Sequence, residues 1–277
     1  MRRTLYLVNE VGSTFYFDYS HKCLIEELDG LGFEFEIEYE DFDAEFVETK
    51  RTIPQRAIDV TLIFLDGYAG FARWREFLTK SKEIRLFYET NIGKKYCYIN
   101  VVSSSKSQLE SNILRSKVKI DCLSLWLVNK SAHIDVKDSG GGKIYSFTYP
   151  YVYAVSFNGK VTVVNDSPRN VPLTIKLIGN CLNPRVVIRQ EGIDVQSLRL
   201  IVDEREEPTI IVSSQPTNQF IRKITSSNEE IDYYDKQDFG YDNFLFLPPG
   251  ESEIFFDPGV REEATCEISF KEEYIAH

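Results

Sequence analysis

The sequence predicts a mainly β protein of two domains with one helix. Three observations support this. Short apolar runs alternate with turn residues, one stretch has a helical period, and a glycine-rich break lies near the middle of the chain. The 277 residues are enough for two domains with separate hydrophobic cores. We place the first domain at 1–138, a linker at 139–142 and the second domain at 143–277.

The acidic stretch 33–40 alternates strictly, with apolar side chains at odd positions and glutamate at even positions. Successive side chains of a strand point to opposite faces, so the pattern predicts a strand with one apolar and one acidic face. The apolar side chains are expected to pack inward; they are Phe33, Phe35, Ile37 and Tyr39. The carboxylates are expected to share the other face; they belong to Glu34, Glu36, Glu38 and Glu40.

The rest of the first domain reads as strands around one helix. The apolar run 56–65 predicts an interior strand, and 83–90 and 95–102 predict a hairpin joined at Asn91-Ile92-Gly93. Between them, aromatic residues recur at helical spacing over 67–82, after Asp66 as N-cap. The apolar face of this helix is expected to cover the sheet; its members include Phe71, Trp74 and Phe77.

The second domain consists of short strands separated by turn residues every 8–12 positions, a spacing typical of an antiparallel sandwich. The predicted strands are 146–157, 160–165, 173–178, 185–190, 198–202, 209–213, 243–247, 251–256 and 265–270.

The charge pattern is uneven. The net charge is −11, and the segment 23–49 has eleven acidic residues and no basic one. An acid-rich chain repels phosphate, so specific nucleic-acid binding is not expected. The five cysteines form no Cys-x-x-Cys pair, which indicates buried thiols made in a reducing cytoplasm and argues against a zinc site. No apolar run is long enough to cross a bilayer as a helix.

The sequence offers no catalytic constellation and no cofactor or metal motif. His21 and Cys23 are two residues apart but lack surrounding acid–base partners, and the glycines at 140–142 lack the residues of a phosphate loop. The loop 232–242 is rich in aspartate and tyrosine. Its aspartates depart from a calcium-loop spacing, whereas its tyrosines leave two alternatives open: stacking on a sugar, or contact with a partner protein. These tyrosines are Tyr233, Tyr234 and Tyr241.

Several motifs occur in the order found in the distal tail proteins of long-tailed, non-contractile phages, and the chain resembles that family over most of its length. They are the GLGF sequence at 30–33, the strand–helix–strand order over 56–90, CLSLW at 122–126, YPYVY at 149–153, IGNCLNP at 178–184 and LPPGESEI at 247–254. In CLSLW, Leu125 stands where the family commonly has proline.

The resemblance implies a tail-tube-like split β-barrel, which forms a ring, followed by a galectin-like β-sandwich. It implies a homohexamer at the virion tail tip, made in the host bacterial cytoplasm. The ring would join the tail tube protein to the tail-associated protein, offer a platform to receptor-binding or baseplate proteins, and let DNA pass through its lumen without specific binding. It implies no catalysis and no cofactor.

Two further interpretations stay open. The alternative function is a carbohydrate-binding module that recognises a host cell-wall glycan. The acidic face of 33–40 is either an ordinary solvated strand face or the lining of the ring lumen. A basic lumen would retain the passing DNA, whereas an acidic one would let it slide.

Overall fold

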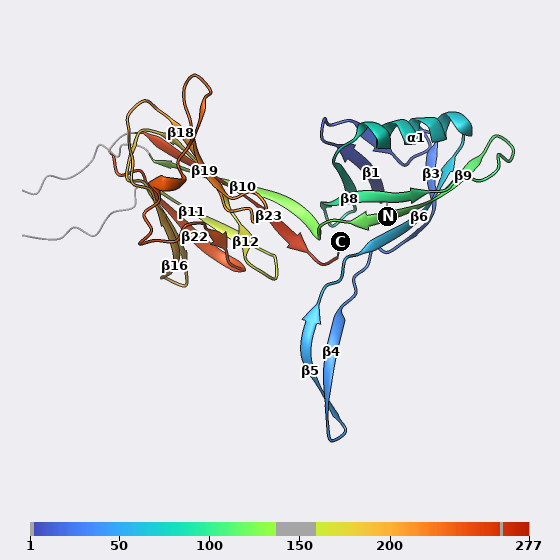
Figure 1. Ribbon diagram of the computed structural model, residues 1–277, viewed down its shortest axis with the longest axis horizontal. Helices are drawn as coiled ribbons and strands as arrows, with labels where there is room; N and C mark the ends of the chain where they lie inside the picture. Colours follow the sequence, from blue (N-terminus) through green and yellow to red (C-terminus); the bar gives the residue numbers. More distant parts are fainter. Residues whose placement is uncertain (1–2, 137–158, 261–262, 277) are drawn as a thin grey trace, which may run out of the picture. The chain divides into compact units, whose positions relative to one another are not determined.

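The computed structural model describes residues 3–136, 159–260 and 263–276 and divides the chain into two compact units (Figure 1). Unit 1 comprises Met1–Val128 and Tyr274–His277, and unit 2 comprises Asn129–Glu273. This division falls after Val128, whereas we expected the boundary at residue 138. It falls within one unbroken strand, β10 (Trp126–Val136). The expected linker and the expected strand 146–157 lie outside the described residues.

The described residues are mainly β with one α-helix, as predicted. The elements of unit 1 before β10 are β1 (Thr4–Asn9), β2 (Thr14–Tyr16), β3 (Cys23–Asp29), β4 (Glu36–Phe42), β5 (Glu45–Thr52), β6 (Ala57–Phe64), α1 (Tyr68–Lys80), β7 (Ile84–Glu89), β8 (Lys94–Ser104) and β9 (Leu114–Cys122).

Seven strands of unit 1 form one antiparallel sheet in the order β2-β1-β7-β8-β9-β6-β3. The outer strands β2 and β3 do not pair with each other in the described part of the chain, so the sheet stays open rather than closing into a barrel. Helix α1 lies over this sheet (Figure 1). Its Trp74 is 1% exposed, packs edge-on against Phe15 and donates a hydrogen bond to Ser104 Oγ at 3.0 Å.

The helix begins without the predicted side-chain cap. Gly67 is the N-cap residue, and Asp66 instead accepts a hydrogen bond from Arg73 Nη1 at 2.7 Å. Gly67 has a φ of 60°, and a Cβ there would lie 2.7 Å from a Leu109 methyl carbon. The turn therefore requires glycine, and the geometry of this turn, not a capping aspartate, starts the helix.

Strands β4 and β5 form a separate hairpin that pairs with no other strand in the described residues. It projects from the body of unit 1 (Figure 1). Every residue of β5 is exposed, and of β4 only Ile37 is partly buried. The hairpin thus lacks a hydrophobic core of its own.

Unit 2 encloses a second core between two antiparallel sheets. One has the order β11-β22-β15-β16; the other contains β10, β23, β13, β18, β19 and β20. The elements are β11 (Gly159–Asn165), β12 (Val171–Pro172), β13 (Thr174–Gly179), β14 (Cys181–Leu182), β15 (Arg185–Gln190), β16 (Ile193–Arg199), β17 (Asp203–Glu204), β18 (Thr209–Ser213), β19 (Phe220–Ile224), β20 (Glu230–Asp232), the 3₁₀ turn η1 (Tyr234–Lys236), β21 (Phe246–Leu247), β22 (Gly250–Asp257) and β23 (Ala264–Tyr274).

Candidate assembly surface

The hairpin β4–β5 has two chemically different faces. Residues directly opposite each other in an antiparallel pair share a face. The register pairs Tyr39 with Glu48 and Asp41 with Phe46, whereas Glu38 pairs with Lys50 and Glu40 with Val47. We call the first set, together with Ile37 and the Arg51 opposite it, the apolar face of the hairpin; the second set, together with Glu36, is its acidic face.

On the acidic face, the structure brings Glu36, Glu38 and Glu40 together on one side of β4, as the period of two predicts. Glu34 precedes the strand. Lys50 forms an ion pair with Glu38 at 2.7 Å, and both side chains are more than half exposed. An exposed pair of this kind contributes roughly 0–1 kcal/mol and leaves the face acidic overall.

The prediction that the odd-numbered side chains pack inward is wrong. Phe33 is 60% exposed and Tyr39 is 56% exposed, because no element of the described chain covers the hairpin. Sequence reasoning also missed Phe42 and Phe46 at the tip, which are 56% and 73% exposed. The sequence did contain a signal for these two residues. Phe42 and Phe46 lie on either side of the turn at 43–44, within a run of acidic residues, and two phenylalanines at that place do not suit a solvated loop.

The base of the hairpin is held by contacts among its own residues. Arg51 makes a bidentate pair with Glu48, at 2.7 and 2.9 Å, and its guanidinium lies 5.0 Å from the ring centre of Phe35. This hydrogen bonding lowers the pKa of Glu48. Phe35 also meets Phe33 edge-on at 5.4 Å. These contacts stiffen the hairpin without hiding its tip.

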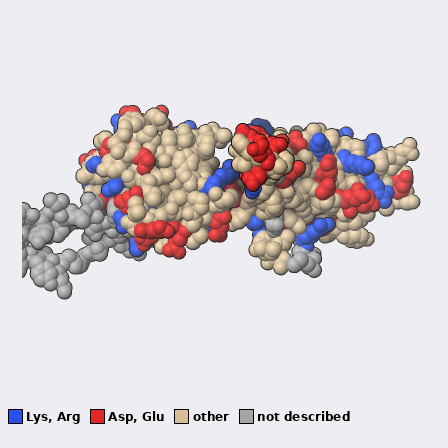
Figure 2. Space-filling view, turned by 90° about the horizontal axis from the view of Figure 1, so that it is seen from below, with Lys and Arg blue, Asp and Glu red and all other residues tan. Residues whose placement is uncertain are grey.

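Figure 2 views the molecule from the side toward which the hairpin projects, and it shows Asp and Glu gathered on this arm, with Lys and Arg on the adjoining surface of the same unit. From residue 34 to 52 the chain has eight acidic and two basic residues. The hairpin therefore presents both apolar side chains and a strong negative charge, a combination that suits a protein surface with aromatic and basic groups.

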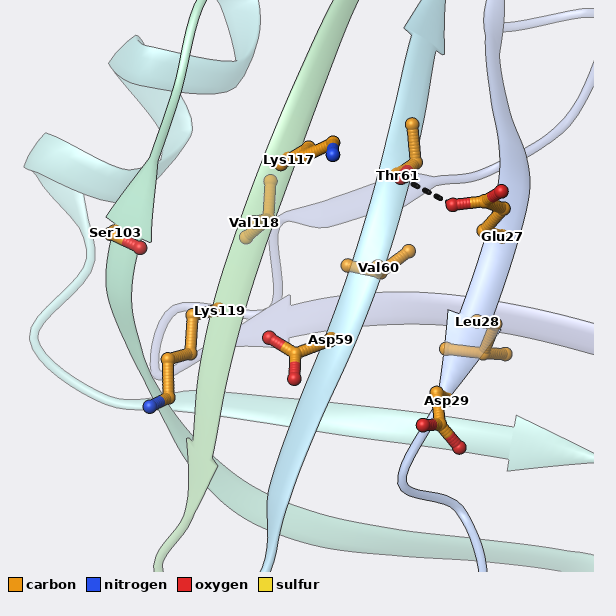
Figure 3. A pocket seen from close by; sticks show the side chains of 10 residues that line it. All are labelled: Glu27, Leu28, Asp29, Asp59, Val60, Thr61, Ser103, Lys117, Val118 and Lys119. Carbon is orange, nitrogen blue, oxygen red and sulfur yellow. Dashed lines mark hydrogen bonds between the residues drawn. The ribbon is translucent and has the colours of Figure 1, made fainter.

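A hollow of about 720 Å³ lies on the solvent face of β3, β6 and β9 (Figure 3). Its lining is charged: Asp29 stands opposite Asp59 in the register, Asp59 stands opposite Lys119, and Glu27 accepts a hydrogen bond from Thr61 at 3.4 Å. No histidine or cysteine lines it. The hollow thus offers charged groups for contact but no nucleophile–base pair.

The three tyrosines of the loop 232–242 have three different environments. Tyr233 donates its hydroxyl to Glu204, which also pairs with Lys223 at 2.6 Å; this second contact raises the pKa of Lys223. The guanidinium groups of Arg185 and Arg199 lie 5.2 and 5.8 Å from the ring centre of Tyr241. Tyr234 is 47% exposed, whereas Tyr233 and Tyr241 are partly buried.

The two residues considered for catalysis, His21 and Cys23, lie in different environments. His21 contacts Asp18 at 2.8 Å and stacks on Tyr16, while Cys23 is 1% exposed and burial raises the pKa of its thiol to about 12. All five cysteines are free and buried. Arg56 Nε lies 3.4 Å from Cys122 Sγ, and hydrogen bonds from Cys97 and Arg56 lower the pKa of the Cys122 thiol.

Within the described ranges, no group of three or more histidine, cysteine, aspartate or glutamate side chains could hold a metal ion. The same part of the chain has no helix long and apolar enough to cross a membrane.

Comparison with known proteins agrees with this geometry. Residues 4–123 match the family described as "Distal tail protein, N-terminal domain". No curated protein sequence matches the chain.

Solved structures share the fold over the whole length. A chain of the phage P2 baseplate, in its activated conformation with Ca, has a TM-score of 0.67 at 13% identity, with 100% of each chain covered. The SPP1 Dit protein, described as a paradigm of the hub adsorption apparatus in phages that infect Gram-positive bacteria, has a TM-score of 0.64 at 12% identity, with 98% of this chain and 99% of that chain covered. Residues 4–123 thus match the N-terminal domain of the distal tail protein family, which confirms the resemblance seen in the sequence motifs.

Proposed function

We propose that this chain is a structural protein of a phage or prophage tail tip, in which six copies form a ring. The ring joins the tail tube to the tail-associated and baseplate proteins below it and offers a platform for host-adhesion proteins. The match of residues 4–123 to a distal tail protein domain and the shared fold of two baseplate or hub proteins support this role. The role requires binding surfaces and no catalysis.

The observation that carries the proposal is the uncovered hairpin β4–β5. An isolated two-stranded hairpin is marginally stable in water, and exposed phenylalanines favour contact with another surface. Because the described chain leaves Phe42 and Phe46 uncovered, we assign their cover to another copy. Each copy then presents an arm and receives one, which is the heterologous contact that closes a ring.

The acidic face of the hairpin fits the lumen interpretation in one respect. Glu36, Glu38 and Glu40 all point to one side and are exposed, so they can face a water-filled channel at little desolvation cost. Carboxylates repel DNA phosphates, and the DNA can slide past them. A virion in which Glu34, Glu36, Glu38 and Glu40 are all replaced by glutamine tests this; normal DNA ejection would reject a lumen role.

Unit 2 supplies the platform in this proposal. Its two sheets enclose a core of their own, and the proposal assigns its outer surfaces to receptor-binding or baseplate proteins. The virion tail tip is the site of action, after synthesis in the host bacterial cytoplasm. The galectin-like character of this sandwich remains a prediction.

Electron microscopy of the purified full-length protein, with its mass in solution, tests the ring. We expect class averages with six-fold symmetry and a matching hexamer mass. A strictly monomeric protein over the micromolar range, where a hexamer interface should be occupied, would contradict the proposal.

One observation favours the alternative, a glycan-binding module. Tyr234 borders a hollow of about 400 Å³ with Phe220, and Gln219, Arg222 and Asp232 line the same hollow. Aromatic rings beside polar side chains suit a sugar. A glycan array probed with the full chain and with Tyr234→Ala decides this; a pure scaffold binds nothing in either form.

A further inference from the structure

The loop 233–242 is attached to β16, which lies at the end of its sheet in unit 2. The backbone N–H of Asp238 donates to the carbonyl oxygen of Arg199 at 3.0 Å, and that of Asp242 donates to the carbonyl oxygen of Ser197 at 2.8 Å. The Ser197 N–H donates in return to the Asp242 carboxylate at 2.7 Å. These bonds hold the loop along the edge of the sheet.

Two side chains of the loop fasten it from the inner side. Gln237 is 2% exposed, and its amide donates a hydrogen bond to the Tyr234 carbonyl oxygen at 2.9 Å. Tyr233 donates its hydroxyl to Glu204, which is itself 8% exposed. Because these contacts hold the loop in one conformation, little conformational entropy remains to be lost when the loop binds another molecule.

The tip of the loop carries an aromatic side chain that these attachments leave in solvent. Phe239 is 66% exposed. It lies in a turn closed by a hydrogen bond from the Tyr241 N–H to the Asp238 carbonyl oxygen at 3.0 Å. Rigid, exposed aromatic side chains are typical anchors of protein–protein interfaces, where they fill a pocket on the partner.

The surroundings of this aromatic side chain are acidic. Residues 229–242 include six acidic residues and one basic residue. Three of the acids form ion pairs within unit 2: Glu230 with Arg222, Asp235 with Lys236 and Asp238 with Arg199. In the described part of the chain the other three have no basic group within 4.0 Å; they are Glu229, Asp232 and Asp242. This excess of negative charge favours a partner surface with lysine or arginine side chains.

Two other occupants fit this loop less well. A second copy of the chain has a net charge of −11 and would bring like charge to the loop. A sugar needs a hollow beside its aromatic platform, and Phe239 does not line the hollow of about 400 Å³ that Tyr234 borders.

We propose that the loop 233–242 is the site at which unit 2 docks another tail-tip protein, and that Phe239 inserts into an apolar pocket rimmed by lysine or arginine side chains on that partner. This inference rests on the proposed tail-tip function. It adds the surface of unit 2 that binds and the chemistry of the protein that is bound.

Photo-crosslinking in assembled tails tests the site. A benzophenone amino acid at position 239 reports on the loop. The same probe at position 193 is the matched control, because Ile193 is 68% exposed and lies at the opposite end of β16. We expect the probe at position 239, and not at position 193, to link this chain to a different tail protein through a peptide with apolar and basic residues. A link only to another copy of this chain, a link to a peptide without basic residues, or no link overturns the proposal.

Substitution of the same residue gives a second readout. Tails with Phe239→Ala should retain about a tenth or less of the crosslinked protein, because the phenylalanine no longer becomes buried in its pocket. Ile193→Ala should leave the amount unchanged. The purified Phe239→Ala chain should unfold as the parent does, because this side chain is exposed. No loss for Phe239→Ala, or an equal loss for both substitutions, overturns the proposal.

The two levels of the account fail in different ways. If tails contain this chain but position 239 forms no link, only this inference fails. If tails lack the chain altogether, the proposed function fails with it.

Discussion

Helix α1 and the hairpin β4–β5 are both rich in aromatic residues, yet these side chains differ in how far they are exposed. Trp74 of the helix is 1% exposed and lies in the core of unit 1, whereas Phe46 of the hairpin is 73% exposed. Helix α1 packs on a seven-stranded sheet, while nothing in the described chain packs on the hairpin. The helix stabilises its own unit, and the hairpin is available to another molecule.

This difference predicts two separate kinds of mutational effect. Substitutions at buried aromatic residues should reduce the free energy of unfolding of each single chain. Substitutions at the exposed aromatic residues of the hairpin should leave that free energy unchanged and weaken assembly.

The largest expected effect is at the helix. Trp74→Ala should reduce the free energy of unfolding by about 3–5 kcal/mol, because it removes a fully buried ring and the hydrogen bond to Ser104. Tyr68→Ala, at a position 55% exposed on the same helix, should change it by less than about 0.5 kcal/mol. Denaturant unfolding measures both. A loss below about 1 kcal/mol for Trp74→Ala would mean that the core does not depend on it.

The hairpin should show the opposite behaviour. Phe46→Ala should leave the unfolding free energy within about 0.5 kcal/mol of the parent. It should weaken assembly by about 1.5–3 kcal/mol, or roughly tenfold to a hundredfold, because a phenylalanine no longer becomes buried between copies. Sedimentation over a concentration series gives the assembly constant. Ile193→Ala, at a residue 68% exposed on β16, is the control and should assemble normally.

A pH titration sharpens the helix side of the comparison. The hydrogen bond from Arg73 lowers the pKa of Asp66 below its usual 3.8. A carboxyl group with a lowered folded-state pKa contributes stability that is present above the unfolded-state pKa and is lost as the pH falls through the folded-state value. Acid unfolding below about pH 4 should therefore be less steep for Asp66→Asn. If the free energy of unfolding falls equally steeply below about pH 4 in both proteins, the hydrogen bond from Arg73 to Asp66 does not contribute to stability.

The smallest expected effect is that of salt on assembly. In the proposed ring, the acidic hairpin would attract basic groups of the neighbouring copy through exposed pairs, each worth roughly 0–1 kcal/mol and screened by ions. Light scattering at low and high salt should show modest weakening as salt rises. A ring that tightens with salt would reject the electrostatic contribution and leave apolar contact alone.

Much of the architecture could be predicted from local patterns. The apolar run 56–65 corresponds to β6, and the predicted strands 185–190 and 209–213 coincide with β15 and β18. Both ends of the helix lie within two residues of the predicted ends. Residue propensity and hydrophobic periodicity suffice to predict an element when the apolar side chains that it buries pack within its own sheet. Short strands such as β17 and β20 were missed because two or three residues carry no period.

The error at residues 33–40 has a different origin. A period of two shows which side chains share a face, but it does not show whether anything covers that face. Tyr39 is 56% exposed, because nothing in the described chain packs on the hairpin. The three loop tyrosines were grouped by sequence proximity, whereas Tyr233 and Tyr241 bind Glu204 and two arginines that are distant in sequence.

The central claim is that the hairpin holds copies of this chain together, and native mass spectrometry tests it most directly. The parent protein and Phe46→Ala are measured at the same micromolar concentration. We predict a hexamer for the parent protein, and mainly monomers for Phe46→Ala with an unchanged unfolding curve. Equal oligomeric states for the two proteins would contradict the account.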